Sequence, residues 1–533
     1  MSKYEGALIT ENGVESLRQY EYRRLDSSHT LSRSLVARNI SVAVLVVTWC
    51  AGLACLIGGA TFLDKTSAGT TGWIRLSMSR SLKESIPLLI NIVVTILTEG
   101  TGFIHATTLR WALGDELIFN SNLRLFSRVR GSWAFGGLSN FLNAGFLILS
   151  YAATSLIFAS FPASDICDAM PLNGYDCKPE NNINTSYVSP GAIMALGCGL
   201  TGISALTTWQ FFSSKVETWF SSPIETAWAS VLARQRVRRG YRCMMSVHES
   251  THPPMPLVPK PRQDPAWSAH AEVRRILIYL WILAALVVAW FVSLLIAIEV
   301  ISRKCKEAGD HCNYVDYYQN VYAGSSWSLL PDTGGLTSVA KISTLDDAGG
   351  QSHTGLPQAA GFTIVFLLIM GFQSVITMGL HCADLLVNMS RDEDTWRTAY
   401  STSGYTSQMA LITALRSWKS VFLFALKPLV HWFFGLGMTF YLGWGIFMRP
   451  PQTLYTSLTV LALAFFSTYL CFERPKGPQP ATFGHLQTLV DLIDDWSEPM
   501  HWGHKGGYSD GIFHAGTART ILDPILIQGQ YAS

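Results

Sequence analysis

The chain alternates polar segments with long apolar ones, and about eight of the apolar segments are long enough to cross a bilayer as helices. They run at 41–63, 86–107, 133–161, 191–213, 276–301, 359–385, 420–448 and 453–472. The pattern predicts an all-α fold, a polytopic transmembrane helical bundle. It divides the chain into an N-terminal tail (1–40), a first four-span unit (41–213), a basic and proline-rich loop (214–275), a second four-span unit (276–472) and a C-terminal tail (473–533).

Composition agrees with this pattern. Of the 533 residues, only 14% are charged and 49% are hydrophobic. Charge this sparse over such a length does not suit a soluble multidomain protein. We therefore expect an integral protein of the endomembrane system or the plasma membrane, with the lipid bilayer as its main partner.

The placement of Lys and Arg predicts the orientation of the spans. The densest basic cluster falls between the fourth and fifth spans and comprises Arg234, Arg236, Arg238, Arg239 and Arg242. Cytosolic loops carry an excess of Lys and Arg, so the N-terminus is expected in the cytosol. An even number of spans returns the C-terminus to the same side. The same bias accounts for the arginines without nucleic acid as a partner.

Cysteines and a glycosylation sequon fit the same topology. Four of the ten cysteines lie in pairs in the two loops assigned to the opposite side, namely Cys167, Cys177, Cys305 and Cys312. Oxidation is permitted there, so two local disulfides are expected, Cys167–Cys177 and Cys305–Cys312. Asn184 begins an Asn-Thr-Ser sequon in the first of these loops, which predicts a glycoprotein.

The second span carries polar residues along one face. At about 100° per residue, six side chains fall within an arc roughly 120° wide. They are Asn91, Thr95, Thr98, Glu99, Gly102 and His105. A carboxylate within a span is expensive to bury and is a candidate proton carrier or cation ligand. A hydrogen-bonded carboxyl that joins helices is the alternative.

The sixth span carries a second polar stripe, formed by Thr363, Gln373, Ser374, Thr377, His381 and Asp384. His381 and Asp384 are three residues apart and share a helix face. Spans 2 and 6 each place a histidine near the cytosolic end, at His105 and His381. This echo suggests, as one interpretation, a 4+4 parallel duplication. Identity between the halves is weak, and their outside loops differ in length.

The seventh span carries Lys427 and His431 four residues apart on one face. Lys427 lies close enough to the cytosolic end for its long stem to reach the interface. We interpret it as a snorkelling lysine in preference to a buried charge.

Two polar segments have features of their own. Residues 252–265 (HPPMPLVPKPRQDP) are typical of an extended proline-rich linker, and a cytosolic partner at this loop is an alternative to a solvated spacer. In the tail, Phe483, Leu486, Val490 and Ile493 form an apolar stripe over 481–496. That spacing predicts an amphipathic helix packed under the bundle.

Signatures of soluble enzymes are missing from the sequence. It contains no Walker loop, no dinucleotide fingerprint after a strand and no nucleophile elbow, so no catalytic residue and no cofactor is implied. His501, His504 and His514 hint at a metal in the tail. A Gly-rich loop holds ligands poorly, so no metal site is predicted.

Three segments of the sequence are similar to those of a known group of proteins. They are IHATTLRWAL with FNSNLRLF inside 104–126, LHCADLLVNMSRDE at 380–393, and HWFFGLGM at 431–438. The chain resembles a group of uncharacterised multi-pass membrane proteins of filamentous fungi over most of its length. The resemblance implies a fungal endomembrane or surface protein, and implies no activity or site residues.

Three functions remain open on this sequence. The first is a transporter-like protein with a polar pathway lined by spans 2 and 6. The second is a structural or interaction membrane protein whose polar groups join helices. The third is an intramembrane enzyme that acts on a lipid or prenyl substrate, with Glu99 and a histidine as acid and base. The sequence does not indicate the oligomeric state, the substrate or the organelle.

Overall fold

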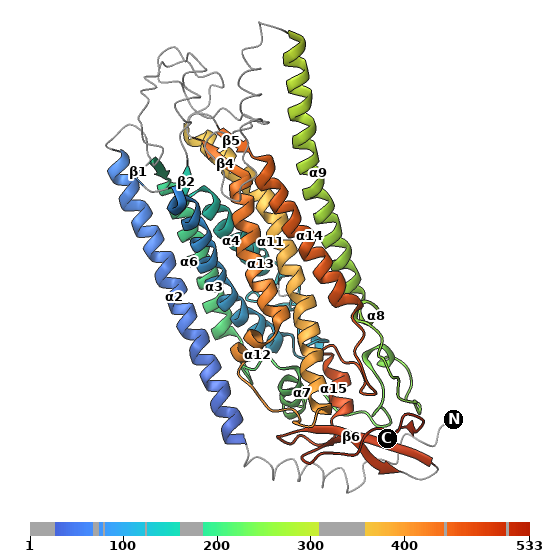
Figure 1. Ribbon diagram of the computed structural model, residues 1–533. Coiled ribbons are helices and arrows are strands. Elements are labelled where there is room, and N and C mark those ends of the chain that lie inside the picture. The colour runs from blue at the N-terminus through green and yellow to red at the C-terminus, as the bar shows by residue number, and fades with distance from the viewer. Residues whose placement is uncertain are drawn as a thin grey trace.

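The computed structural model describes residues 27–67, 74–77, 80–122, 125–159, 185–308, 358–441, 445–507 and 511–532. Within these residues eight long helices lie side by side (Figure 1). The first four are α2 (Ser27–Ser67), α3 (Arg80–Leu113), α4 (Gly137–Leu156) and α6 (Pro190–Ser213). The second four are α9 (Ala271–Ala308), α11 (Gln358–Arg397), α13 (Trp418–Gly437) and α14 (Pro450–Phe472).

Among the described residues, seven of these helices are long and apolar enough to span a membrane, α4 being the exception. This helix has 20 residues, and its Asn140 and Asn143 are both buried. Two amides lower its hydropathy, and burial between neighbouring helices keeps them from lipid. The structure therefore confirms the predicted class, a mostly helical membrane protein with several spans.

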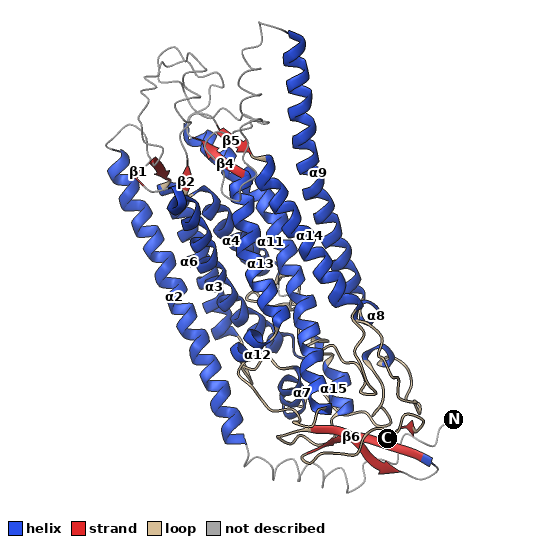
Figure 2. Ribbon diagram, in the orientation of Figure 1, coloured by secondary structure: helices blue, strands red, loops and turns tan. Residues whose placement is uncertain are grey.

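Short strands correct the prediction of a purely α fold (Figure 2). β1 (Ile74–Ser77), β2 (Phe158–Ala159) and β3 (Thr185–Val188) form an antiparallel sheet in the order β1-β3-β2. β4 (Met438–Tyr441) pairs with β5 (Gly445–Met448). Both sheets lie at the end of the bundle opposite the C-terminus.

Several predicted helix boundaries were wrong. The seventh span, predicted over 420–448, ends at Gly437, because the β4–β5 hairpin is as apolar as the helix before it. Conversely, α2 begins at Ser27, inside the predicted tail, and α11 continues to Arg397, twelve residues past the predicted end at 385. Hydropathy marks the apolar part of a helix, and polar turns extend it beyond the membrane.

Glycines bring α2 and α6 into close contact. A Cβ atom at Gly52 would lie 2.7 Å from Cγ2 and 2.9 Å from the backbone N of Thr201. On the facing helix, a Cβ at Gly197 would lie 2.9 Å from the carbonyl oxygen of Gly52. Small residues at such a contact allow the helix backbones to approach.

We expect Gly52→Ala to lower stability by about 1–3 kcal/mol, because the new methyl group meets backbone that cannot move aside. Gly58→Ala on the same helix is the matched control, since its Cβ would meet nothing within 4 Å. Alanine is also the better helix former, so this control should be neutral or stabilising. Thermal unfolding of the purified variants in detergent measures the difference, and equal midpoints would contradict the close contact.

A second hydrophobic core lies at the end of the bundle where the C-terminus of the chain is found (Figure 1). We call this part, residues 223–270 and 473–532, the basal assembly. Its elements are α7 (Pro223–Leu232), η3 (Val247–Glu249), α8 (Ala266–Ala269), α15 (Leu486–Leu492), β6 (His501–Gly507), β7 (Ile512–Ala518) and β8 (Gln530–Tyr531). Strands β6 and β7 are antiparallel, whereas β7 and β8 are parallel. Trp396 at the end of α11 and Tyr405 after it are buried in this core, so the bundle and the assembly are joined.

The basal assembly changes two interpretations of the polar segments. The tail helix is shorter than predicted, Leu486–Leu492 instead of 481–496, although the whole apolar stripe is buried. In the proline-rich segment, residues 252–256 are exposed, and its first residue, His252, donates its backbone N–H to the carbonyl oxygen of Glu249 at 2.9 Å. Beyond them, the backbone of Leu257 exchanges two hydrogen bonds with Tyr531, at 3.0 and 2.9 Å.

Arginines of the basic cluster have structural partners in the basal assembly. Arg239 forms an ion pair with Asp491 of α15 at 2.6 Å. Arg242 donates to the carbonyl oxygens of Ser250 and His252, at 3.0 and 2.7 Å. The Arg239–Asp491 pair fastens the loop after α7 to α15, and the bonds of Arg242 join two parts of that loop.

Polar contacts also tie the first helix unit to the second near the basal assembly. Asp392 of α11 is buried, and its Oδ2 accepts from Nδ2 of Asn120 at 2.9 Å and from Oγ of Ser121 at 3.0 Å. Both donors follow η2 (Gly114–Glu116), the short helix at the end of α3. In the second unit, η5 (Thr398–Tyr400) and α12 (Ala410–Arg416) connect α11 to α13.

A half-buried ion pair in the basal assembly predicts a pH dependence. His514 Nε2 lies 2.8 Å from Asp494 Oδ2, and Lys505 Nζ lies 2.8 Å from the same oxygen. Burial lowers the pKa of His514, but its hydrogen bonds with Asp494 and Cys243 outweigh burial and raise that pKa above 6.5. A raised histidine pKa adds stability below 6.5, and this stability is lost as the pH rises through the folded value.

We therefore expect wild-type protein to lose thermal stability between pH 6 and pH 8 relative to His514→Asn, whose side chain does not titrate. The comparison is the difference between the two unfolding midpoints at each pH. A difference that stays constant across this range would contradict the ion pair.

Candidate functional site between the two helix units

The two helix units meet through their inner helices. α3 contacts α13, and α4 contacts both α11 and α13. Buried positions at this interface include Asn91, Thr95, Thr98 and His105 on α3, and Gln373, Thr377 and His381 on α11. Most of the two polar stripes therefore faces protein in this structure, whereas Thr363 of the α11 stripe is exposed.

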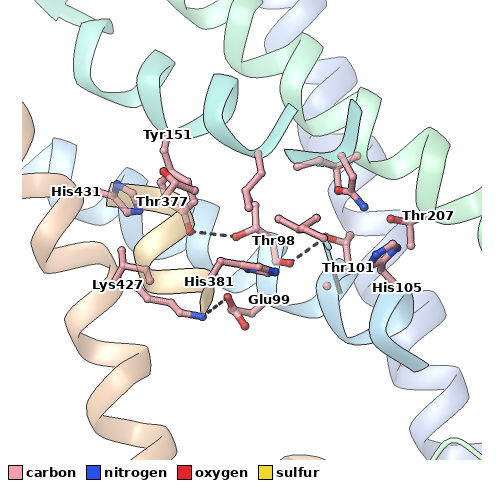
Figure 3. Close-up of a pocket in the computed structure, with 16 residues that line it drawn as sticks. Thr98, Glu99, Thr101, His105, Tyr151, Thr207, Thr377, His381, Lys427 and His431 are labelled. Atoms are coloured by element: carbon pink, nitrogen blue, oxygen red, sulfur yellow. Dashed lines mark hydrogen bonds and ion pairs between the residues drawn. The ribbon is translucent and has the colours of Figure 1, made fainter. Parts of the chain in front are cut away.

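A cluster of opposite charges lies at this interface, and Figure 3 shows its Lys427–Glu99 pair. The Lys427 ammonium on α13 lies 2.6 Å from Glu99 Oε1 on α3. It also lies 2.7 and 2.8 Å from the two carboxylate oxygens of Asp384 on α11. Three helices from both units thus contribute one charged group each.

The position of Lys427 differs from the interpretation drawn from its sequence. Its side chain is only 7% exposed, whereas the side chains of Glu99 and Asp384 are 32% and 18% exposed. A snorkelling lysine would extend its ammonium away from the bundle. Here the ammonium turns inward because two carboxylates repay the cost of leaving water.

His381 lies beside the charged cluster. Its Nδ1 is 3.7 Å from Asp384 Oδ2, within range of an ion pair when the imidazole is protonated. The side chain is 6% exposed. A proton that enters the cluster therefore has an imidazole and two carboxylates as acceptors within a short distance.

His431 of α13 has contacts of its own at the interface, separate from those of the charged cluster. Its ring stacks on Tyr151 of α4, with ring centroids 3.8 Å apart and an angle of 12° between planes. Its Nδ1 lies 3.0 Å from Oε1 of Gln373, an oxygen that only accepts, so this nitrogen carries the proton. The Tyr151 hydroxyl bonds to Thr95 at 3.1 Å and to Thr98 at 3.2 Å.

His105 and Asn91 occupy the two ends of the α3 stripe. His105 Nδ1 donates to Oε1 of Gln210 on α6 at 2.6 Å. The amide of Gln210 then donates to the Ala134 carbonyl and to Ser139, each at 3.1 Å. Asn91 Oδ1 accepts from Thr154 of α4 at 2.9 Å. These bonds fix the α3 stripe against α4 and α6.

A small cavity, partly open to its surroundings, lies against the charged cluster, and about 40 Å³ of it is accessible to water-sized groups. Glu99, His105, His381, Lys427 and His431 all line it (Figure 3). The lining also includes Thr98, Thr101, Thr207 and Thr377. The hydroxyls of Thr207 and Thr377 are buried and have no hydrogen-bond partner among the described residues.

The cluster contains two carboxylates and one ammonium, with a histidine beside them. With Glu99, Asp384 and Lys427 all ionised, their sum is one negative charge. A proton on His381, whose Nδ1 lies 3.7 Å from Asp384 Oδ2, brings this sum to zero. The geometry is therefore suited to a step in which a positive charge enters and leaves.

Four polar residues of the site, Thr101, Tyr151, Thr207 and Gln210, were not among the predicted candidates. Tyr151 lies on α4, and Thr207 and Gln210 lie on α6. Gln210 and Thr207 are polar residues within an apolar run, and that signal was available in the sequence.

Other predicted residues lie outside the described part of the chain. This holds for Cys167, Cys177, Cys312 and Asn184, while Cys305 lies in α9 with its side chain not described. The two disulfides and the glycosylation stay predictions. Among the described residues no group of three or more His, Cys, Asp or Glu is placed to hold a metal ion.

Comparison with protein-family models, with curated proteins and with solved structures finds no match. The described fold and the interface cavity define an integral membrane protein with a charged site between two groups of helices.

Proposed function

We propose that this protein is a transporter-like membrane protein in which the cavity between the two helix units carries a proton- or cation-dependent step. The observation that carries the proposal is the position of Lys427 between Glu99 and Asp384, at 2.6 to 2.8 Å. Intramembrane carboxylates that face a polar cavity mark ion and proton pathways in pumps and transporters. The pathway is lined by α3, α11 and α13.

The proposal includes eight spans, with α4 as the eighth and both termini in the cytosol. The buried amides of α4 explain its low hydropathy. A helix packed inside the bundle faces protein more than lipid, so it can span the membrane with fewer apolar residues. The excess of arginine in the basal assembly supports the cytosolic assignment of this end. The resemblance to fungal membrane proteins stays part of the proposal.

We further propose a 4+4 parallel duplication, supported by matching helix contacts. In the first unit α2 packs on α6, α4 packs on α6 and α3 packs on α4. The corresponding helices of the second unit make the same pairs, α9 with α14, α13 with α14 and α11 with α13. Between units, α3 contacts α13 and α11 contacts α4, as a two-fold axis along the bundle requires.

The strand pairs before α6 and α14, β2 with β3 and β4 with β5, share a backbone hydrogen bond at the start of the helix that follows. Ser189 N donates to the carbonyl oxygen of Ile157, and Arg449 N donates to that of Gly437, each at 2.9 Å. Proline begins the helix that follows in both cases, at Pro190 and Pro450. Parallel repeats of this kind place substrate sites at the repeat interface, which is where the cavity lies.

Reconstitution tests the function directly. Protein in liposomes that contain a pH-sensitive dye should acidify the lumen when a potassium diffusion potential, negative inside, is imposed. We expect acidification faster than in protein-free liposomes. Rates equal to the protein-free leak over a range of lumenal pH and cation conditions would count against the proposal.

A structural role for the cluster is the second candidate, favoured by one observation. Each charge of the cluster already has an opposite charge within 3 Å, as expected for groups that only join helices. The two candidates differ in Glu99→Gln. A structural contact tolerates the amide, whereas a proton-dependent step does not.

A further inference from the structure

A groove lined by aliphatic and aromatic side chains follows α9, the helix at the outer edge of the bundle (Figure 1). Its volume is about 340 Å³. The lining comprises Trp267, Leu277, Ile278, Trp281, Ile282 and Ala285. Leu277 is buried, whereas Ile278 and Ile282 are exposed, so the groove is open on the outer side of the bundle.

Contacts with α14 hold the two tryptophans of the groove. Trp267 of α8 stacks on Phe472, with ring centroids 5.2 Å apart. Trp281 packs edge-on against Phe465 at 5.1 Å, and its indole N–H donates to Thr468 at 3.0 Å. Because both rings are fixed by a neighbouring helix, the groove is formed before any ligand enters it.

The length of the groove matches one leaflet of a bilayer. Residues 276–298 of α9 include no charged residue and are long enough to cross the hydrocarbon core. Arg274, the charged residue one turn before the groove, and Ala285 are about 16 Å apart along the helix, at 1.5 Å per residue. Half of the hydrocarbon core is about 15 Å thick, so one acyl chain whose headgroup lies at Arg274 spans the groove.

Arg274 lies on the same face of α9 as the groove. At 100° per residue, it falls inside the arc of about 140° that the lining residues of α9 occupy. Arg275 lies just outside this arc, and both arginines are exposed. Among the described residues, neither side chain has an ion pair or a hydrogen bond. The basal end of the groove therefore presents positive charge.

Nearby acidic groups leave this charge uncompensated. Glu272, in the first turn of α9, falls about 80° outside the arc of the groove. Asp264 pairs with Lys260 at 3.2 Å, and Glu473 at the end of α14 pairs with Lys419 at 3.0 Å. An anionic group at the end of the groove would complement the two arginines.

We infer that the groove binds one acyl chain of an anionic glycerophospholipid whose phosphate lies at Arg274. The guanidinium group donates two parallel N–H bonds to a phosphate, and basic residues at the ends of membrane helices bind anionic headgroups. A zwitterionic lipid also has a phosphate, but its ammonium group adds a positive charge beside the arginines. The site lies outside the cavity, and this inference does not rest on the proposed function.

Lipid binding to the full chain in detergent, measured by native mass spectrometry, tests the inference. Dioleoyl phosphatidylglycerol and dioleoyl phosphatidylcholine share their acyl chains, whereas glycerol phosphate has none. We expect phosphatidylglycerol to bind about fivefold more tightly than phosphatidylcholine, which is the effect of one arginine near an anionic headgroup. Equal affinities for the two lipids, or glycerol phosphate bound as tightly as phosphatidylglycerol, would overturn the inference.

Two variants separate the headgroup from the chain. Arg274→Gln should lower the affinity for phosphatidylglycerol about fivefold and leave phosphatidylcholine unchanged. Arg130→Gln, which removes an exposed arginine at the basal end of the first helix unit, is the matched control. Ala285→Phe fills the groove and should weaken both lipids, whereas Ala54→Phe, at an exposed alanine of α2, should weaken neither.

Photo-crosslinking locates the bound chain. Phosphatidylglycerol with a diazirine in one acyl chain should label residues 277–285, and Ala285→Phe should lose this label. Label confined to other helices would overturn the inference. A dimer of the full chain that Ala285→Phe dissociates would assign the groove to a second copy of the protein and would overturn it as well.

Discussion

Replacing Lys427 with methionine should destabilise the protein by about 3 kcal/mol, near the lower end of the range for breaking a buried ion pair. Methionine retains the length of the stem and removes the ammonium, so Glu99 and Asp384 remain with two negative charges between three helices. The exposure of these two side chains, 32% and 18%, permits partial relief by water, which places the effect at the low end. Thermal or denaturant unfolding of the purified variant measures it.

Neutralising the partners provides the control for this prediction. Lys427→Met combined with Glu99→Gln and Asp384→Asn leaves no charge in the cluster. We expect this triple variant to recover most of the stability, since replacing a whole buried ion pair is often neutral. A single Lys427→Met variant as stable as wild type would show that the three groups do not interact as the distances indicate.

Glu99→Gln should have the opposite stability effect and the largest functional effect. The variant leaves Lys427 with Asp384, a neutral pair, and the amide oxygen still accepts from the ammonium. We therefore expect normal expression and a stability at least equal to that of wild type. Because the site then has no residual negative charge, its uptake of a proton or cation should be lost.

The same substitution predicts a cellular result. Where deletion of the protein has a phenotype, Glu99→Gln should reproduce that phenotype even though the protein accumulates and traffics normally. His105→Ala should be milder, because His105 bonds to Gln210 at 2.6 Å and lies outside the charged cluster. A Glu99→Gln strain indistinguishable from wild type would assign Glu99 to helix contact.

Much of the bundle was predictable because a membrane imposes a simple rule on length and hydropathy. Seven of the predicted spans coincide with helices that meet that rule. Helix ends were less predictable, since α11 continues past the apolar segment until Trp396 is buried in the basal assembly. The basal assembly itself was missed because its core comes from short segments far apart in sequence, such as Tyr405, Leu486 and Trp502.

The site was predictable within each helix and not between helices. The periodicity of α3 placed Glu99 on a polar face, and that of α11 placed His381 with Asp384. Their common partner Lys427 is 328 residues from Glu99, and no pattern within one span specifies that distance in sequence. The position of Lys427 near a helix end favoured a snorkelling side chain. The attraction of its ammonium to two nearby carboxylates instead determines its direction.

Proton uptake measured side by side for wild type and Glu99→Gln tests the central claim most directly. Both proteins are reconstituted at equal density in liposomes that contain a pH-sensitive dye, and the initial rate of lumenal acidification is measured after a potential is imposed. Thr459→Val, on α14 and away from the cavity, is the matched control. The account predicts acidification by wild type and Thr459→Val, and a Glu99→Gln rate equal to the protein-free leak. Equal rates in wild type and Glu99→Gln would contradict it.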